Sequence, residues 1–101
     1  MSSDYTVQLL RAAEDDLNEI VTLLCQDNME AAERFLSKTE LGLRELSNHP
    51  RKGFVPNEHR LAAGNFRYTI IEGCLILYTM EEEIVLVQRV LPHARKYKQI
   101  L

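Results

Sequence analysis

In the first half of the chain, apolar side chains change from a spacing of two residues to a helical spacing. Residues 5–10 alternate apolar and polar side chains, which predicts a short strand. Residues 12–25 and 29–46 each carry an apolar stripe at helical spacing. Either Asp27 or Asn28 can cap the second helix, because both types accept hydrogen bonds from helix N–H groups. The short linker predicts an antiparallel helix hairpin whose stripes must lie on another layer.

The second half of the chain predicts a run of three strands. Residues 60–72 alternate, residues 74–80 are apolar on both faces, and residues 84–91 form an aliphatic run that Pro92 ends. A strand, two helices and three strands predict an α+β fold in two layers, with the helix hairpin packed on one face of an antiparallel β-sheet. The length of 101 residues suits a single domain, residues 1–101.

The main loop is predicted at residues 51–58, where Gly53 and Pro56 interrupt the pattern. We expect Phe54 and Val55 to tether this loop to the core. The basic side chains that precede them should project outward.

Composition narrows the class of protein. Apolar residues make up 46% of the chain, but none of the apolar runs approaches the roughly 18 residues of a membrane helix. The N-terminus has no basic region before an apolar stretch, so we expect no secretory signal. Cys25 and Cys74 are far apart, and we expect buried, free thiols in a reducing cytoplasm.

The net charge of −3 is unevenly distributed. Residues 1–50 hold ten acids and four bases, whereas residues 51–101 hold five acids and eight bases. The basic second half suggests a local surface for an anionic partner. The alternative is that the helices simply favour glutamate while the sheet happens to carry arginine.

Five stretches resemble one known family when they are taken in this order. They are Asp16-Leu17-Asn18-Glu19-Ile20, Leu46 to Pro50 followed by Gly53, Arg60 to Arg67, Leu75-Ile76-Leu77-Tyr78, and Val87-Gln88-Arg89-Val90-Leu91-Pro92-His93. Together they resemble the RelE/ParE superfamily of bacterial toxins from toxin–antitoxin operons. The last stretch is closer to the ParE branch, although Pro92 displaces the histidine by one position.

This resemblance implies a β-α-α-β-β-β fold with the first strand beside the last. It also implies a cognate antitoxin whose flexible C-terminal segment wraps the toxin. ParE-type toxins poison DNA gyrase and are not known to be enzymes, whereas RelE-type toxins cut mRNA, mostly in the ribosome. A homodimer and a toxin–antitoxin heterotetramer both stay open.

A RelE-type endoribonuclease would need a group to orient or deprotonate the ribose 2′-OH, cations for the phosphate and an acid for the leaving oxygen. Resemblance to these ribonucleases would map such groups onto the concave sheet face. The candidates are Lys52, Arg67, Arg89, His93 and Tyr97. We expect Arg67 and Arg89 to lie free on the face that the helices leave bare, where their paired donors could clamp a phosphate.

Each candidate also has a structural explanation. Arg67 and Arg89 could form ion pairs with Glu72 or Glu83, and His93 and Tyr97 could pack the C-terminal tail onto the sheet. The loop has a single lysine, where strong RelE relatives have more. We therefore favour a toxin that is not itself an enzyme.

Three functions follow: a gyrase-binding toxin used in plasmid stabilisation, an mRNA endoribonuclease acting with the ribosome, and a degenerate, non-toxic interaction module. The helix stripes and the basic face should bind an apolar, acidic antitoxin segment. We expect no metal and no cofactor. The proposed binding surface is Arg51, Lys52, Arg60, Arg67, Arg89, Arg95, Lys96 and Lys98.

Overall fold

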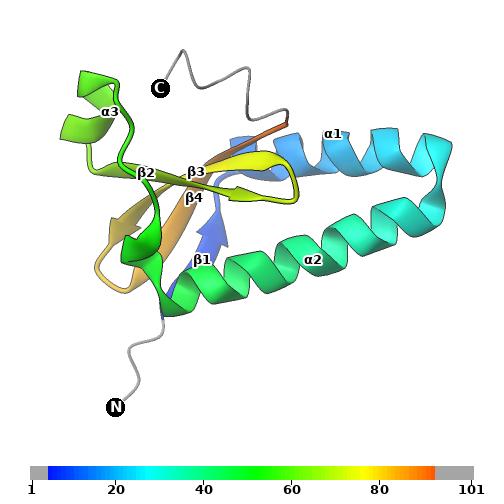
Figure 1. Ribbon diagram of the computed structural model, residues 1–101, viewed down its shortest axis with the longest axis horizontal. Coiled ribbons are helices and arrows are strands. Elements are labelled where there is room, and N and C mark those ends of the chain that lie inside the picture. Colours follow the sequence, from blue (N-terminus) through cyan, green and yellow to red (C-terminus); the bar gives the residue numbers. More distant parts are fainter. Residues whose placement is uncertain (1–4, 93–101) are drawn as a thin grey trace.

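The computed structural model describes residues 5–92. Its elements are β1 (Thr6–Leu9), α1 (Arg11–Asp27), α2 (Met29–Asn48), the 3-10 turn η1 (Pro50–Lys52), α3 (His59–Ala63), β2 (Phe66–Ile71), β3 (Cys74–Glu81) and β4 (Ile84–Leu91). Helices α1 and α2 form a hairpin beside the sheet, and its tip projects beyond the strands (Figure 1). The predicted order and the α+β class are confirmed.

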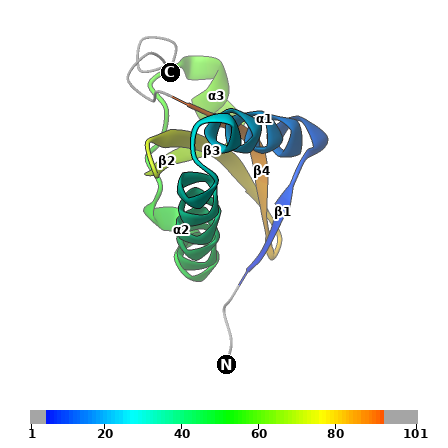
Figure 2. The same ribbon diagram turned by 90° about the vertical axis from the view of Figure 1, so that its right-hand side faces the viewer.

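The sheet is mixed, with the strand order β1-β4-β3-β2. β2, β3 and β4 are antiparallel as predicted, whereas β1 pairs in parallel with β4, so the expectation of a wholly antiparallel sheet is wrong at this edge. The cause is the helix hairpin, which returns the chain to the start of β1, where the Tyr5 N–H donates to the Ser47 carbonyl at 3.0 Å. Two tight turns then reverse the chain twice, and β4 ends up running with β1 (Figure 2).

The core lies between the hairpin and one face of the sheet. Strand β3 is buried from Cys74 through Thr79, as predicted for a central strand. Val7, Val85, Val87 and the side chains that share their face pack against Ala13 of α1 and Leu46 of α2. The expected burial of both thiols is wrong for Cys25, which is exposed near the hairpin tip, and right for Cys74.

The hairpin turns at Asn28. Its side-chain oxygen accepts from the Glu30 N–H at 2.9 Å and the Ala31 N–H at 3.2 Å, so Asn28 rather than Asp27 caps α2. Helix α1 extends to Asp27, two residues past the predicted end.

The predicted strand over residues 60–72 is wrong in its first part. Residues His59–Ala63 form the short helix α3 because the Glu58 carboxylate caps it by accepting from the Leu61 N–H at 3.0 Å. The hydrogen bond from Leu61 lowers the pKa of Glu58 below 4.5. Asn65, with φ of 64°, turns the chain into β2. A local side-chain cap thus outweighs the alternating pattern.

Candidate functional site

Two side chains of the sheet hold the loop that follows α2. The Tyr78 hydroxyl donates to the Pro50 carbonyl at 2.5 Å, and Arg67 Nη1 donates to the carbonyls of Gly53 at 3.0 Å and Arg51 at 3.3 Å. A Cβ on Gly53 would overlap the Tyr78 hydroxyl, so this close approach requires glycine. We call the hydrogen bonds of Arg67 and Tyr78 the loop clamp.

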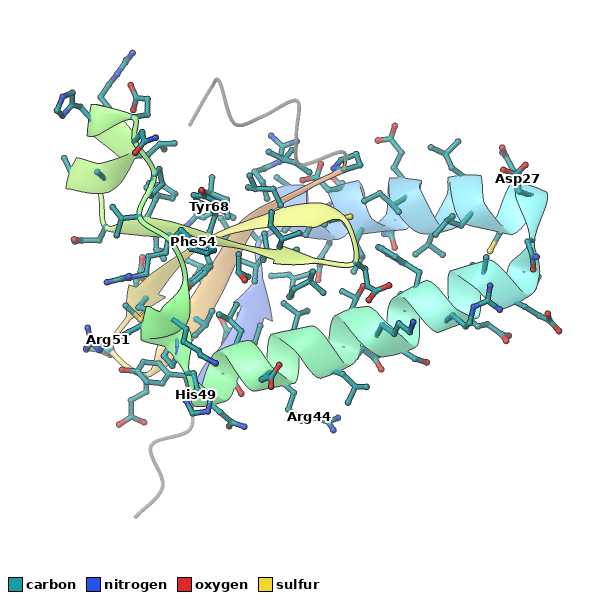
Figure 3. The ribbon with its side chains drawn as sticks, viewed as in Figure 1. Asp27, Arg44, His49, Arg51, Phe54 and Tyr68 are labelled. Carbon is teal, nitrogen blue, oxygen red and sulfur yellow. The ribbon has the colours of Figure 1, made fainter. Side chains whose placement is uncertain are left out.

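The loop clamp leaves the cations of η1 pointing outward. Arg51 and Lys52 are exposed, and Figure 3 shows Arg51 and His49 at the end of the molecule where α2 finishes. Next along the chain, Phe54 forms an antiparallel bridge with Tyr68, with hydrogen bonds of 2.7 and 2.8 Å in the two directions. The loop is therefore fixed through its backbone while its side chains face solvent.

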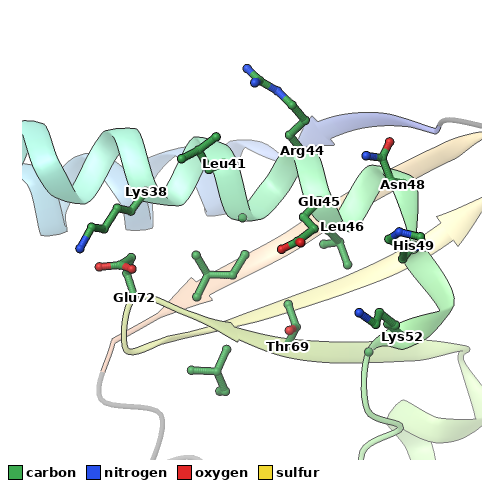
Figure 4. A pocket seen from close by; sticks show the side chains of 14 residues that line it. Lys38, Leu41, Arg44, Glu45, Leu46, Asn48, His49, Lys52, Thr69 and Glu72 are labelled. Carbon is green, nitrogen blue, oxygen red and sulfur yellow. The ribbon is translucent and has the colours of Figure 1, made fainter.

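A groove of about 750 Å³ lies between the C-terminal half of α2 and β2 (Figure 4). Cations on its walls are Lys38, Arg44 and Lys52, and its acids are Glu45 and Glu72. Leu41 and Ile70 also line it, and they are 60% and 46% exposed. Gly42 lets helix and strand approach closely, since a Cβ there would lie 2.7 Å from Ile71 Cγ2. The groove thus combines apolar side chains with a small excess of positive charge.

The outer edge of β2 opens into this groove. The two-residue turn between Ile71 and Cys74 directs the hydrogen bonds of Ile71 toward β3, and those of Ile70 away from it. The backbone of Tyr68 points outward like that of Ile70, and it pairs with Phe54. The residues before Phe54, in η1, turn away from the strand and do not extend this pairing toward Ile70. Within residues 5–92 no backbone partner meets the N–H and C=O of Ile70, so a strand could pair there.

Toward the opposite edge of the sheet, on β4, Arg89 is held by helix α1. Its Nε and Nη2 donate to the two carboxylate oxygens of Asp16 at 2.6 and 2.9 Å, and the Val90 N–H donates to the same group at 3.0 Å. β1 ends at Leu9, so Asp16 takes over as the partner of β4 beyond it. Partial burial would raise the pKa of Asp16, but the hydrogen bonds from Arg89 and Val90 and the charge of Arg89 together lower it below 3.8.

The expectation that Arg67 and Arg89 both lie free on the bare face is wrong. Arg67 pairs in register with Tyr78 and so shares the helix-facing side, whereas Arg89 pairs with Leu77 on the opposite side. Within the described residues, loop carbonyls hold Arg67 and Asp16 holds Arg89, whereas the structural alternative suggested Glu72 or Glu83. The two groups that were predicted to act together are therefore held by different elements, Arg67 by the loop after α2 and Arg89 by α1.

The remaining predicted residues divide into three groups. Arg51, Lys52 and Arg67 meet at the loop, and Arg60 projects from α3 with 94% of its side chain exposed. Outside the described residues lie His93, Arg95, Lys96, Tyr97 and Lys98. The interpretation from sequence missed Asp16 as the partner of Arg89, and Tyr78 as the side chain that holds the loop together with Arg67. The acidic side chain at the start of a helix and the tyrosine that ends an apolar run were both visible but had no assigned partner.

Two buried titratable groups near these sites have raised pKa values. Burial raises the pKa of the Tyr78 hydroxyl above 10.0, which the Gly53 backbone and the charge of Arg67 offset only in part. Burial and the charge of Glu72 raise the pKa of the Cys74 thiol above 9.0. Across residues 5–92, His, Cys, Asp and Glu side chains form no group of three or more that could hold a metal ion. Nor does that part of the chain contain a helix long and apolar enough to cross a membrane.

The chain matches a toxin family model in sequence, and its fold is similar to chains of two toxin–antitoxin structures. The family model described as the ParE toxin of the type II toxin–antitoxin system parDE matches residues 7–97. A chain of the chromosomal ParDE toxin–antitoxin system from P. aeruginosa superposes with a TM-score of 0.71 and 14% identity, covering 90% of this chain and 98% of that one. A chain of the RelBE2 toxin–antitoxin complex from Mycobacterium tuberculosis superposes with a TM-score of 0.61 and 20% identity, covering 88% of this chain and 98% of that one. Curated protein sequences give no match.

The two structural similarities concern the fold, since the identities are low. The family match has a wider basis, because it runs from β1 through the helix hairpin and the whole sheet. It confirms the resemblance drawn from the five sequence stretches, including the closer relation to the ParE branch. The chain belongs to the ParE toxin family of type II toxin–antitoxin systems.

Proposed function

We propose that this protein is a toxin that inhibits DNA gyrase by binding it and that a cognate antitoxin neutralises it. The observation that carries the choice of gyrase over mRNA is the placement of Arg67 and Arg89. Arg67 Nη1 donates to loop carbonyls, Nε and Nη2 of Arg89 donate to Asp16 of α1, and strand β3 lies between the strands that carry the two arginines. To clamp one phosphate, both guanidinium groups would have to turn away from their present acceptors. This would break the hydrogen bonds that hold the loop and those that join Asp16 to β4.

The antitoxin segment is proposed to bind in the groove between α2 and β2. The unpaired edge of Ile70 can accept an extended strand by backbone hydrogen bonds, and Leu41 and Ile70 offer apolar contacts. Lys38, Arg44 and Lys52 favour a segment with acidic side chains. The two similar structures, one a ParDE system and one a RelBE2 complex, support an antitoxin as the partner class.

The gyrase proposal is tested with the purified full-length chain. We expect it to inhibit supercoiling of relaxed plasmid by gyrase or to trap cleaved DNA, and to leave messenger RNA intact in a translation mixture. Unimpaired supercoiling at toxin excess would contradict gyrase as the target. Cleavage of the message would replace it by ribonuclease activity, and harmless expression without antitoxin would favour a degenerate interaction module.

The antitoxin proposal is tested by calorimetry with the small protein encoded next to this chain. Leu41→Asp and Ile70→Asp should each weaken binding about tenfold or more, because they place charge in an apolar contact. Leu23→Asp is the matched control, since Leu23 is 57% exposed on α1 and does not line the groove. If all three variants bind the antitoxin with the same affinity, the groove is excluded as its binding site.

A further inference from the structure

Phe54 and Val55 form an exposed apolar pair on the loop after η1. Their exposed fractions are 61% and 53%, so the expectation that they tether the loop to the core is wrong. Pro56, directly after them, is buried and anchors the loop in their place. Neither residue of the pair lines the groove proposed for the antitoxin. Two adjacent large apolar side chains that are exposed to solvent indicate an interaction site more strongly than isolated ones do.

Phe54 is held in place despite its exposure. Phe54 exchanges two backbone hydrogen bonds with Tyr68, and its ring contacts the Tyr68 ring with centroids 5.5 Å apart (Figure 3). The loop clamp fixes the preceding carbonyls of Pro50, Arg51 and Gly53. Binding through this loop would therefore lose little conformational freedom, which is the property of a pre-organised contact.

Basic residues precede and follow the pair along the chain, in contrast to the acidic chain as a whole. Residues 51–60 hold Arg51, Lys52 and Arg60 against the single acid Glu58. The Glu58 carboxylate is already used by the N–H of Leu61 and lies 3.5 Å from Arg60. Along the chain, the loop therefore carries its apolar pair between basic side chains, which we call the basic rim.

We infer that residues 51–60 are a docking loop for an acidic protein surface with an apolar pocket that receives Phe54 and Val55. Aromatic and arginine side chains dominate such contacts, with charges at the rim. The adjacent aliphatic Val55 favours a protein pocket over nucleic acid, whose bases offer stacking faces. The inference rests on the proposed function, because it assigns to this loop the surface that holds the toxin's target.

The experiment compares two double variants of the full-length chain. Phe54→Ser with Val55→Ser removes the apolar pair, and Leu23→Ser with Met29→Ser removes a matched pair, 57% and 63% exposed, at the hairpin tip. Circular dichroism and thermal unfolding verify that both variants fold. We expect the loop variant to need about 10- to 100-fold more protein for half-inhibition of gyrase supercoiling, and the tip variant to match the wild type.

A charge comparison tests the basic rim. Arg51→Glu with Arg60→Glu should weaken inhibition and reduce its dependence on salt, because the rim attracts an acidic surface. Arg34→Glu on α2 is the control for a charge reversal elsewhere. Binding of a fluorescent single-stranded RNA should be the same for the wild type and the Phe54→Ser, Val55→Ser variant. Selective loss of RNA binding would overturn a protein as the occupant.

The remaining outcomes separate this inference from the gyrase proposal. Full inhibition by the loop variant, or equal loss in the tip variant, would overturn the docking loop and leave gyrase as the target. If the wild type arrests growth without affecting gyrase, the gyrase proposal fails, and the docking loop is then tested by growth arrest. Loss of arrest in the loop variant alone then supports the docking loop, and retained arrest overturns it. A wild type that neither inhibits gyrase nor arrests growth overturns both.

Discussion

Replacement of Asp16 by asparagine should destabilise the protein by about 2 kcal/mol at pH 7, because hydrogen bonds to charged groups contribute about 1.5–3 kcal/mol. The carboxylate receives three hydrogen bonds, two from Arg89 and one from the Val90 N–H. The side chain of Asp16 is 15% exposed and that of Arg89 is 47% exposed, so solvent screens part of the ion pair. Asparagine keeps the shape and one acceptor, which keeps the loss below that of a truncation.

The assay is urea unfolding followed by circular dichroism, with thermal unfolding alongside. For a chain of 101 residues, 2 kcal/mol corresponds to a fall in melting temperature of about 8–16 °C. The pKa of Asp16 is lower in the folded than in the unfolded state, so the carboxylate stabilises the fold above the unfolded value near 3.8 and loses this effect as pH falls through the folded pKa. The difference between wild type and Asp16→Asn should therefore be full at pH 7 and narrow below pH 4.

Asp15→Asn is the matched control. Asp15 precedes Asp16 on the same helix, but its side chain is 67% exposed and lies 3.8 Å from Arg11, an arrangement worth about 0–0.5 kcal/mol. Equal losses of stability in the two variants would refute the assignment of Asp16 as the partner that closes the β4 edge. So would a difference between wild type and Asp16→Asn that does not change with pH.

Three further predictions concern the hairpin and the loop clamp. Gly42→Val should cost about 1–3 kcal/mol in urea unfolding by overpacking against Ile71, and Ile71→Ala should recover part of that loss in a double-mutant cycle; additive effects would argue against the contact. Asn28→Ala should cost about 1 kcal/mol by removing the cap of α2, whereas Asp27→Ala should change stability little; the reverse order would return the cap to Asp27. Arg67→Met should speed tryptic cleavage at the two basic residues of η1, because it frees the carbonyls of Arg51 and Gly53 and so loosens the loop, and Arg67→Lys should restore part of the protection; unchanged cleavage would refute the clamp.

Local patterns in the sequence were sufficient for most of the secondary structure. Apolar residues at helical spacing mark the buried side of α1 and of α2, and the run that is apolar on both faces marks β3 as central. Each of these patterns lies within a short stretch of neighbouring residues, so it can be read from the sequence. The pattern failed at residues 59–63, where one carboxylate at Glu58 begins a helix inside an alternating stretch. Family resemblance then supplied the placement of β1 beside β4, which no local pattern contains.

The candidate site depended more strongly on tertiary structure. Sequence identified Arg67 and Arg89 as cations within strands, but the register with β3 decides that they face opposite sides. A bulge between the partners Leu77 and Tyr78 adds one residue to β4 and sets which side Arg89 faces. Such a shift depends on pairing across strands and is invisible in a single stretch.

By itself, the sequence determined the order of elements, the hairpin and sheet, the family and the excess of positive charge after residue 50. Only the tertiary structure decided that Asp16 holds Arg89, that Arg67 and Tyr78 hold the loop, and that Phe54 stands in solvent. The reason is physical: apolar spacing encodes which face of an element is buried, whereas the partner of a polar side chain is chosen among residues up to 74 positions away that folding brings within hydrogen-bond distance.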